Sequence, residues 1–271
     1  MKNFKFKNGE TIPALGIGTW KLEEANAYKA TLKALEIGYR HIDTADKYGN
    51  HKEVGQAILD SGVARKDIFL TTKVWYSELS PTKLNESVKR FLEELQTEYI
   101  DLLLIHWPNK GESLEKSLKT MSQLKAEGII KNIGVSNFTI HHLKDCLESG
   151  VEIVNNQVEL HPTFGQFELA EFAKENGIVI TAYSPLGRGA DLEIPGLVEI
   201  ARKYDKTVPQ MILNWIVARG IVAIPKGTSE EHIKENFEAL DFELSAEDIR
   251  AISDLDKGER LIDNGWSEFD Y

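Results

Sequence analysis

The sequence contains four side chains that could act together in proton transfer: Asp43, Tyr48, Lys73 and His106. Three of them lie at the ends of short apolar runs, and Tyr48 follows the first of these runs closely. Each one alone has a structural explanation, as a helix cap, a packed ring, a lysine with an apolar stem or a core histidine. Their repeated position at the ends of successive runs favours a shared site.

Such a set could protonate a carbonyl oxygen as it becomes an alkoxide. A free phenol has a pKa near ~10 and is a weak acid at neutral pH, but a nearby ammonium lowers that pKa by stabilising the phenolate. We therefore expect Lys73 to lower the pKa of Tyr48, and Asp43 to keep Lys73 charged. His106 would orient the carbonyl oxygen. None of these residues supplies a hydride, so the site implies a cofactor.

Eight short apolar runs alternate with longer stretches of helical periodicity, a pattern typical of parallel strands connected by helices. The runs are LGIG, RHID, IFLTTKV, DLLLIH, IIKNIGV, EIVNNQ, IVITAY and IVAIP. Between the third and fourth runs, Ser80 and Pro81 predict the start of a helix with an apolar stripe that continues to residue 96. With about 34 residues per unit, the sequence predicts an α/β protein, a (β/α)₈ TIM barrel in one domain over residues 1–271.

A short N-terminal β-hairpin is expected before the first run. Phe4 and Phe6 alternate with lysines and lead into Asn8 and Gly9. This pair predicts a type I′ turn, in which both central residues have positive φ. At the opposite end of such a barrel, the C-terminal ends of the strands meet at one mouth, so residues far apart in sequence can share a site.

Other folds and functions are weaker alternatives. A doubly wound sheet would carry GxGxxG after its first strand, but GIGTWK has Lys21 at the position of the third glycine. A barrel with a reactive lysine could be a Schiff-base aldolase, with Lys73 as the nucleophile. A cofactor-sensing subunit with little turnover is the non-enzymatic alternative.

Composition disfavours several classes of partner. The chain has 32 Lys and Arg against 43 Asp and Glu, and its formal net charge of -11 opposes binding to nucleic acid or anionic membranes. It has no apolar stretch of about eighteen residues and no signal-peptide pattern, so we expect a cytoplasmic protein. His142 and Cys146, the single cysteine, could share a helix face but lack a third ligand, so no metal site is expected. The sequence favours a monomer.

The motifs around these residues resemble those of the aldo-keto reductases, in particular the prokaryotic branch of diketogluconate and glyoxal reductases. They follow the family's order along nearly the whole chain: GIGTW (16–20), GYRHIDTADKYGN (38–50), TTKVW (71–75), LLLIHWP (102–108), GVSNF (134–138), NNQVELHP (155–162), AYSPLG (182–187) and IPKGTSEEHIKEN (224–236). The resemblance implies a barrel enzyme that reduces aldehydes and ketones with a nicotinamide cofactor. It also implies Tyr48 as general acid, Lys73 and Asp43 as tuning residues, and His106 as the residue that orients the carbonyl.

The resemblance further implies positions for the cofactor and the substrate. The nicotinamide amide would be held by Ser136, Asn137 and Gln157, and its ring would stack on Tyr183. The phosphates and ribose would contact Ser184, Leu186 and Lys226, and the adenine would contact Glu235 and Asn236. The substrate pocket would have three aromatic walls, Trp20, Trp75 and Trp107.

Two departures from the family pattern affect these expectations. His232 stands where many NADPH-preferring relatives have an arginine, and Gly227 replaces a hydroxyl residue. Lys226, Thr228 and Ser229 remain as phosphate partners, so we expect NADPH to bind and NADH to be used as well.

The second departure is length. The loop 184–195 and the tail after Leu255 are short, which predicts an open pocket and broad carbonyl specificity. In that tail, Trp266 and Phe269 would either reach over the mouth or pack on the barrel.

Overall fold

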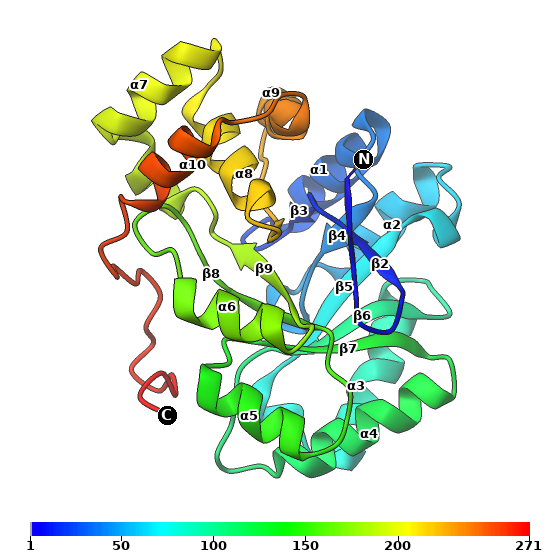
Figure 1. Ribbon diagram of the computed structural model, residues 1–271. Helices are drawn as coiled ribbons and strands as arrows, with labels where there is room; N and C mark the ends of the chain where they lie inside the picture. Colours follow the sequence, from blue (N-terminus) through cyan, green and yellow to red (C-terminus); the bar gives the residue numbers. More distant parts are fainter. Residues whose placement is uncertain (1) are drawn as a thin grey trace.

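The computed structural model describes residues 2–271, and its centre is a barrel of eight parallel strands (Figure 1). Neighbouring strands in the sheet are also consecutive in sequence, from first to last. The strands are β3 (Ile17–Gly18), β4 (His41–Asp43), β5 (Phe69–Val74), β6 (Ile100–Ile105), β7 (Ile130–Ser136), β8 (Asn155–Glu159), β9 (Val179–Tyr183) and β10 (Val222–Ala223). A parallel bridge between Leu15 and Ala223, with a 2.9 Å hydrogen bond from Gly16 N to Ala223 O, closes the sheet on itself.

Helices surround the barrel, which confirms the predicted (β/α)₈ fold. They are α1 (Glu24–Ile37), α2 (His51–Asp60), α3 (Pro81–Glu94), α4 (Leu114–Ala126), α5 (Ile140–Glu148), α6 (Phe167–Glu175), α7 (Pro195–Tyr204), α8 (Val208–Ala218), α9 (Glu230–Phe237) and α10 (Ala246–Ser253). Short 3₁₀ segments join them: η1 (Asp46–Tyr48), η2 (Arg65–Asp67), η3 (Tyr76–Glu78), η4 (Gly187–Glu193) and η5 (Glu238–Leu240). Within residues 2–271, no helix has the length and apolar character needed to cross a membrane.

The elements form close to where the sequence predicts them. Helix α3 begins at Pro81 after Ser80, and buries Leu84, Val88 and Phe91 on one face, although the Ser80 side chain makes no capping hydrogen bond. Strand β8 is displaced from the predicted run EIVNNQ, because it begins at Asn155 and continues to Glu159.

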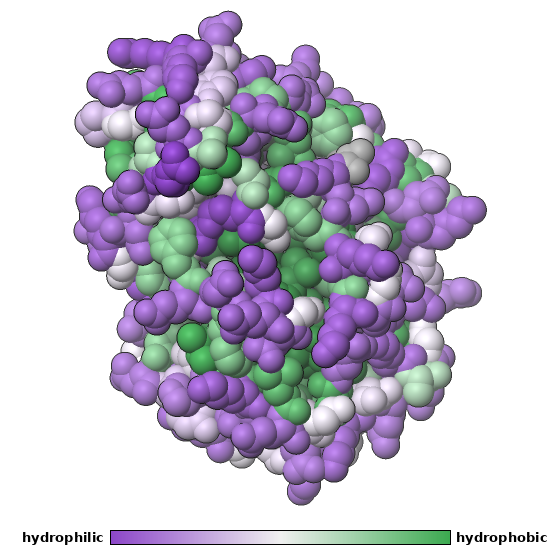
Figure 2. All heavy atoms as spheres, viewed as in Figure 1, coloured by the Kyte–Doolittle hydropathy of each residue, from purple (hydrophilic) through white to green (hydrophobic). Residues whose placement is uncertain are grey.

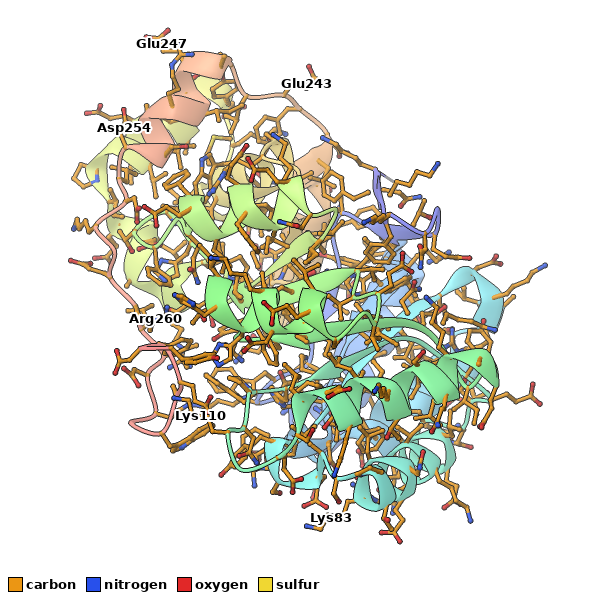
Figure 3. All side chains as sticks on the ribbon, turned by 60° about the horizontal axis from the view of Figure 1, so that its bottom comes forward. Lys83, Lys110, Glu243, Glu247, Asp254 and Arg260 are labelled. Atoms are coloured by element: carbon orange, nitrogen blue, oxygen red, sulfur yellow. The ribbon has the colours of Figure 1, made fainter. Side chains whose placement is uncertain are left out.

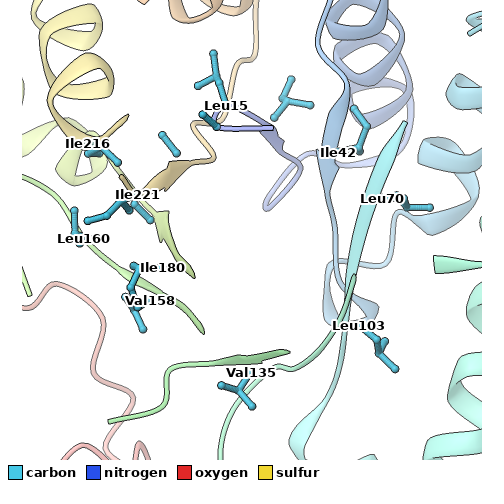
Figure 4. Packing of buried hydrophobic residues seen from close by; sticks show 14 of the residues in the cluster. Leu15, Ile42, Leu70, Leu103, Val135, Val158, Leu160, Ile180, Ile216 and Ile221 are labelled. Atoms are coloured by element: carbon cyan, nitrogen blue, oxygen red, sulfur yellow. The ribbon is translucent and has the colours of Figure 1, made fainter. Parts of the chain in front are cut away.

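Side chains point alternately outward and inward along each strand, so the apolar residues form two separate clusters. Side chains that point outward, such as Ile42, Leu70 and Leu103, pack under the helices in the larger cluster (Figure 4). Side chains that point inward, such as Leu102 and Leu104, form a second cluster inside the barrel. This second cluster leaves the inward positions at the strand ends for polar residues.

The N-terminal hairpin closes the barrel end away from the mouth. Strands β1 (Asn3–Lys5) and β2 (Thr11–Pro13) pair antiparallel, and Phe6 and Ile12 join the inner cluster. The predicted type I′ turn is wrong, because Gly9 has φ +93° whereas Asn8 is not among the residues with positive φ. The bonds Gly9 N to Phe6 O and Phe6 N to Glu10 O instead define a three-residue loop, in which only the last residue needs positive φ.

Candidate active site

The barrel brings the four predicted proton-transfer residues to its mouth. Asp43 ends β4, Lys73 lies near the end of β5, and His106 directly follows β6. Tyr48 ends the 3₁₀ segment η1, which stops at Gly49 with φ +66°. At that φ a glycine avoids the steric penalty of a Cβ atom, so the chain can turn sharply after the phenol.

The Lys73 ammonium is fully buried and donates three hydrogen bonds. Its Nζ lies 2.6 Å from Asp43 Oδ1, 2.9 Å from Thr44 O and 3.3 Å from Tyr48 Oη. These bonds use all the donors of an ammonium group. An amine in this state is not free to attack a carbonyl, which argues against the Schiff-base aldolase alternative.

The predicted lowering of the Tyr48 pKa is wrong for this state of the protein. Burial raises the pKa of Tyr48 well above its usual value, and the Asp43 carboxylate raises it further. Because Asp43 forms an ion pair with Lys73, the phenol faces a nearly neutral pair rather than an isolated cation. Tyr48 therefore remains protonated at neutral pH, and Lys73 bonds its oxygen, which leaves the O–H free to point elsewhere.

Burial also determines the states of the neighbouring groups. It raises the pKa of Asp43 and lowers that of Lys73, while their mutual attraction opposes both shifts. For His106, burial and the charge of Lys73 lower the pKa well below its usual value. A neutral His106 keeps one ring N–H for donation, and its Nδ1 has no hydrogen-bond partner among residues 2–271. Its ring packs edge-on against Tyr48 and Trp75.

The four residues predicted to hold the nicotinamide lie beside this group. Gln157 Nε2 donates to Asp43 Oδ2 at 2.6 Å, and the Tyr183 hydroxyl donates to Asn137 Oδ1 at 2.7 Å. Asn137 Nδ2 in turn donates to Ser136 Oγ at 3.1 Å. This amide and hydroxyl network is thus directly hydrogen-bonded to the proton-transfer residues.

The residues predicted to contact the rest of the cofactor are more dispersed. Lys226, Thr228, Ser229 and His232 are exposed, and Ser229 Oγ caps α9 by accepting from His232 N at 3.2 Å. Lys226 makes no ion pair with a residue in the described part of the chain, 2–271.

The residue Gly227 and the remaining predicted cofactor contacts are packed more closely against the protein. A Cβ atom at Gly227 would lie 2.4 Å from Ile233 Cγ1, so close packing on α9 requires a glycine there. Asn236 is buried on α9 beside the half-buried Glu235. Ser184, with φ +48°, and Leu186 begin the loop after β9 and are half-buried.

An aromatic wall lines the mouth next to His106. Trp75 and Trp107 both pack against Trp266 of the C-terminal tail, with ring centroids 6.0 Å and 5.1 Å apart. Phe269 packs on Trp107 at 5.7 Å. The tail therefore reaches over the mouth, which was one of the two positions predicted for it. Trp20 lies on the barrel rim and is 37% exposed.

A buried charged group at the mouth was not identified from the sequence. Glu159 and His161 belong to the motif NNQVELHP, but only Gln157 received a role there. His161 Nε2 lies 3.1 Å from Glu159 Oε1, and its Nδ1 lies 2.9 Å from Asp191 Oδ2 in η4. Glu159 also accepts hydrogen bonds from the backbone N–H groups of Leu261 and Ile262. The group therefore joins β8, the loop after β9 and the tail.

His142, which the sequence analysis considered as a metal ligand, also contacts the tail. His142 Nδ1 lies 2.9 Å from Thr139 Oγ1 at the start of α5, and its Nε2 lies 3.2 Å from Glu268 Oε2. Cys146 is buried on the same helix, and burial raises the pKa of its thiol.

Comparisons with known proteins agree with this geometry. The model of the Aldo/keto reductase family matches residues 14–257. The chain is 43% identical over 259 residues to the 9,11-endoperoxide prostaglandin H2 reductase of Trypanosoma cruzi, covering 94% of this chain and 91% of that protein. It is 42% identical over 262 residues to the glyoxal reductase of Bacillus subtilis, covering 96% and 95%.

Solved structures lead to the same family. An aldo-keto reductase from a Medee basin deep-sea metagenome library superimposes with a TM-score of 0.94 at 39% identity, covering 97% of each chain. The fold is thus that of a barrel oxidoreductase. This chain belongs to the aldo/keto reductase family, and the resemblance seen in its motifs is confirmed.

Proposed function

We propose that this protein is a carbonyl reductase that uses NADPH, and also NADH, to convert aldehydes and ketones into alcohols, with Tyr48 as the general acid. The observation that carries the proposal is the position of the buried Lys73 ammonium between the Asp43 carboxylate and the Tyr48 hydroxyl. Family membership supports an oxidoreductase acting on carbonyl groups. A cofactor sensor without turnover would not require this proton-transfer group.

Each residue of the four-residue group has its own role in the reaction. A neutral His106 donates an N–H to the carbonyl oxygen and orients it toward Tyr48. Tyr48, kept protonated by its surroundings, transfers its proton to that oxygen as negative charge develops there. Lys73 donates to the phenolate that remains, and Asp43 keeps the lysine charged.

The side chains at the ends of β7, β8 and β9 fit a nicotinamide. Ser136, Asn137 and Gln157 offer the hydroxyl and amide groups that would pair with its carboxamide, and the Tyr183 ring offers a stacking surface. The bond from Gln157 to Asp43 ties this set to the proton donor. When bound, the reduced nicotinamide supplies the hydride. Lys226, exposed and without an ion pair in the described chain, suits a phosphate.

The names of related proteins support small aldehydes among the substrates. Besides the glyoxal reductase, a methylglyoxal reductase of Salmonella typhi is 41% identical over 256 residues, covering 93% of this chain. We propose a broad range of carbonyl substrates, with Trp20, Trp75 and Trp107 as walls of the pocket.

The test compares wild type with Tyr48→Phe and follows nicotinamide absorbance with several aldehydes. Loss of the general acid should lower kcat by about a hundredfold to ten-thousandfold. Nucleotide affinity, measured by tryptophan fluorescence, should stay the same. Tyr28→Phe on α1 removes a hydroxyl that bonds Asp60 far from the mouth and should have wild-type activity. Undiminished turnover by Tyr48→Phe would remove Tyr48 from its proposed role.

A further inference from the structure

We propose that Arg90 on α3 is a positioning residue for the general acid, because it holds the short segment that carries Tyr48 in contact with Lys73. This inference rests on the proposed carbonyl reduction and adds a residue that acts through Tyr48. Arg90 lies on the outside of the barrel, and its side chain is 45% exposed. It belongs neither to the four-residue proton-transfer group nor to the predicted cofactor contacts.

The segment that carries Tyr48 is too short to fix its own position. It is the 3₁₀ segment η1, in which the Tyr48 N–H donates to Ala45 O at 3.0 Å and the Gly49 N–H donates to Asp46 O at 3.2 Å. A turn closed by so few bonds has little stability of its own, because these bonds do not offset the entropy lost when its backbone is fixed. The position of the phenol therefore depends on bonds from this segment to the rest of the barrel.

On the C-terminal side of Tyr48, Asn50 supplies such bonds. Its Nδ2 donates to Thr19 O at 3.0 Å and to Leu22 O at 2.8 Å. Its Oδ1 accepts from Thr44 Oγ1 at 2.9 Å. Asn50 thus fixes the end of the segment to the loop after β3, and the start of the segment needs a separate anchor.

Asp46, the first residue of η1, is anchored by Arg90. Arg90 Nη1 lies 2.8 Å from Asp46 Oδ1, and the Asp46 side chain is only 16% exposed. In the part of the chain that the structure describes, Arg90 is the one cation that pairs with Asp46. The Arg90 guanidinium carbon lies 5.0 Å from the centroid of the Phe91 ring, which helps to hold the long side chain against the helix. The ion pair therefore attaches the start of η1 to a helix.

The same helix is also bonded toward the strand that carries Lys73. Glu94 Oε2 lies 3.4 Å from Arg90 Nη1 and 3.1 Å from His51 Nδ1. The His51 ring is buried at the start of α2, and its Nε2 lies 2.8 Å from Thr72 Oγ1. Thr72 directly precedes Lys73 on β5. Through Arg90 and Glu94, α3 is thus joined both to η1 and to β5.

The relative position of η1 and β5 sets the contact between the phenol and the ammonium. Tyr48 Oη lies 3.3 Å from Lys73 Nζ, just beyond the common range of about 2.7 to 3.2 Å for such a bond. A bond near its outer limit is lost when the turn moves outward even slightly. The phenolate that remains after proton transfer would then lose its cation, so loss of the Arg90 anchor should slow the chemical step.

Other charged pairs on the surface have a simpler explanation. The surface is mostly hydrophilic in the view of Figure 2, and several ion pairs join residues one turn apart on the same helix. Such pairs contribute little to stability and do not connect separate elements. The pair of Arg90 with Asp46 differs, because it joins two elements and its acid is half-buried two residues before Tyr48.

The test measures NADPH oxidation in a single turnover with saturating aldehyde, so that cofactor release does not limit the rate. Arg90→Gln should slow this step about twofold to fivefold, because the strength of a partly exposed ion pair limits the effect. KM for the aldehyde and the affinity for NADPH should stay the same. Arg90→Lys keeps the charge and should retain part of the lost rate.

Asp46→Asn removes the other member of the pair. It should slow the same step to the same extent, and the double variant with Arg90→Gln should be no slower than either single variant, since all three lack the same interaction. The melting temperature should fall by less than about 4 °C in each variant. A larger fall, or additive losses of rate, would indicate a general structural role and overturn the inference.

Lys83→Gln is the matched control. Lys83 lies two turns before Arg90 on the same face of α3, and Figure 3 labels it at the outer surface. It also joins α3 to a 3₁₀ segment, since its Nζ lies 3.7 Å from Glu78 Oε1 in η3. Because η3 carries none of the proton-transfer residues, Lys83→Gln should keep the wild-type single-turnover rate.

Hydrogen–deuterium exchange tests the anchor without relying on activity. The amides of Tyr48 and Gly49 should exchange about twofold to fivefold faster in Arg90→Gln than in wild type, while those of β5 should not change. If the wild type reduces no aldehyde, the proposed function fails, and this exchange still decides whether Arg90 holds η1. Unchanged exchange, or a full single-turnover rate in Arg90→Gln beside an active wild type, would overturn the inference.

Discussion

Lys73 Nζ and Asp43 Oδ1 form a 2.6 Å ion pair in which neither side chain is more than 2% exposed. Removing one member of such a pair leaves the other charge buried and unpaired. Lys73→Met should therefore destabilise the protein by about 3 to 5 kcal/mol, measured by urea unfolding, and abolish activity.

The double variant Asp43→Asn with Lys73→Met tests the cause. With no charge left buried, it should recover much of the lost stability but none of the activity. Lys119→Met breaks a surface pair with Glu115 and should change stability little. A double variant no more stable than Lys73→Met would show that the loss comes from packing.

His161 should make stability depend on pH in the alkaline range. Burial is the largest single influence and opposes its protonation, but the hydrogen bonds to Asp191 and Glu159 and the charges of these carboxylates together outweigh it and raise its pKa to about 9. Because this folded-state pKa exceeds the ordinary unfolded value near ~6.5, the stabilisation is complete below that value and is lost as pH rises through 9. The contribution is at most about 3 kcal/mol.

Melting temperatures measured from pH 7 to 10 check this. The wild type should lose stability across that interval more steeply than His161→Gln. His142→Gln should retain the wild-type slope, since burial lowers the pKa of His142 and that residue is already neutral in this range. Parallel curves for wild type and His161→Gln would contradict the assignment.

Cofactor preference should respond to one position on α9. His232 is exposed beside Ser229, and the family resemblance implies an arginine at this position for the 2′-phosphate. His232→Arg should raise the ratio of kcat/KM for NADPH over NADH by about ten- to hundredfold. Gln56→Arg adds the same charge on α2, on a different face, and should leave the ratio unchanged. A wild-type preference for NADPH of many thousandfold would refute the expected use of NADH.

The sequence predicts the barrel and the grouping of Asp43, Tyr48, Lys73 and His106 at its mouth, because both depend on local patterns. Apolar runs alternate with helical stripes, and chemically active residues recur at the run ends. The turn at Asn8 and Gly9 was mispredicted, since the same two residues suit more than one hairpin loop. The pKa of Tyr48 was mispredicted because the sequence shows a neighbouring lysine but not the depth of burial, which dominates.

The hydrogen bonds that the tail makes to Glu159 could not be predicted. The partners of Glu159 lie about a hundred residues further along the chain, and no periodic signal connects them. The sequence did contain one signal for this buried group. Glu159 and His161 are two residues apart, so they can share one face at the end of a strand.

The tail from residue 257 onward lies beyond the last helix of the barrel, yet Trp266 and Phe269 in it extend the aromatic wall at the mouth. In the proposed function, the barrel would carry the chemistry and the tail would contribute to substrate recognition. Under that division, a change confined to this short surface segment would alter recognition and leave the barrel interior unchanged. Grafting this segment onto a relative would transfer selectivity without redesigning the catalyst.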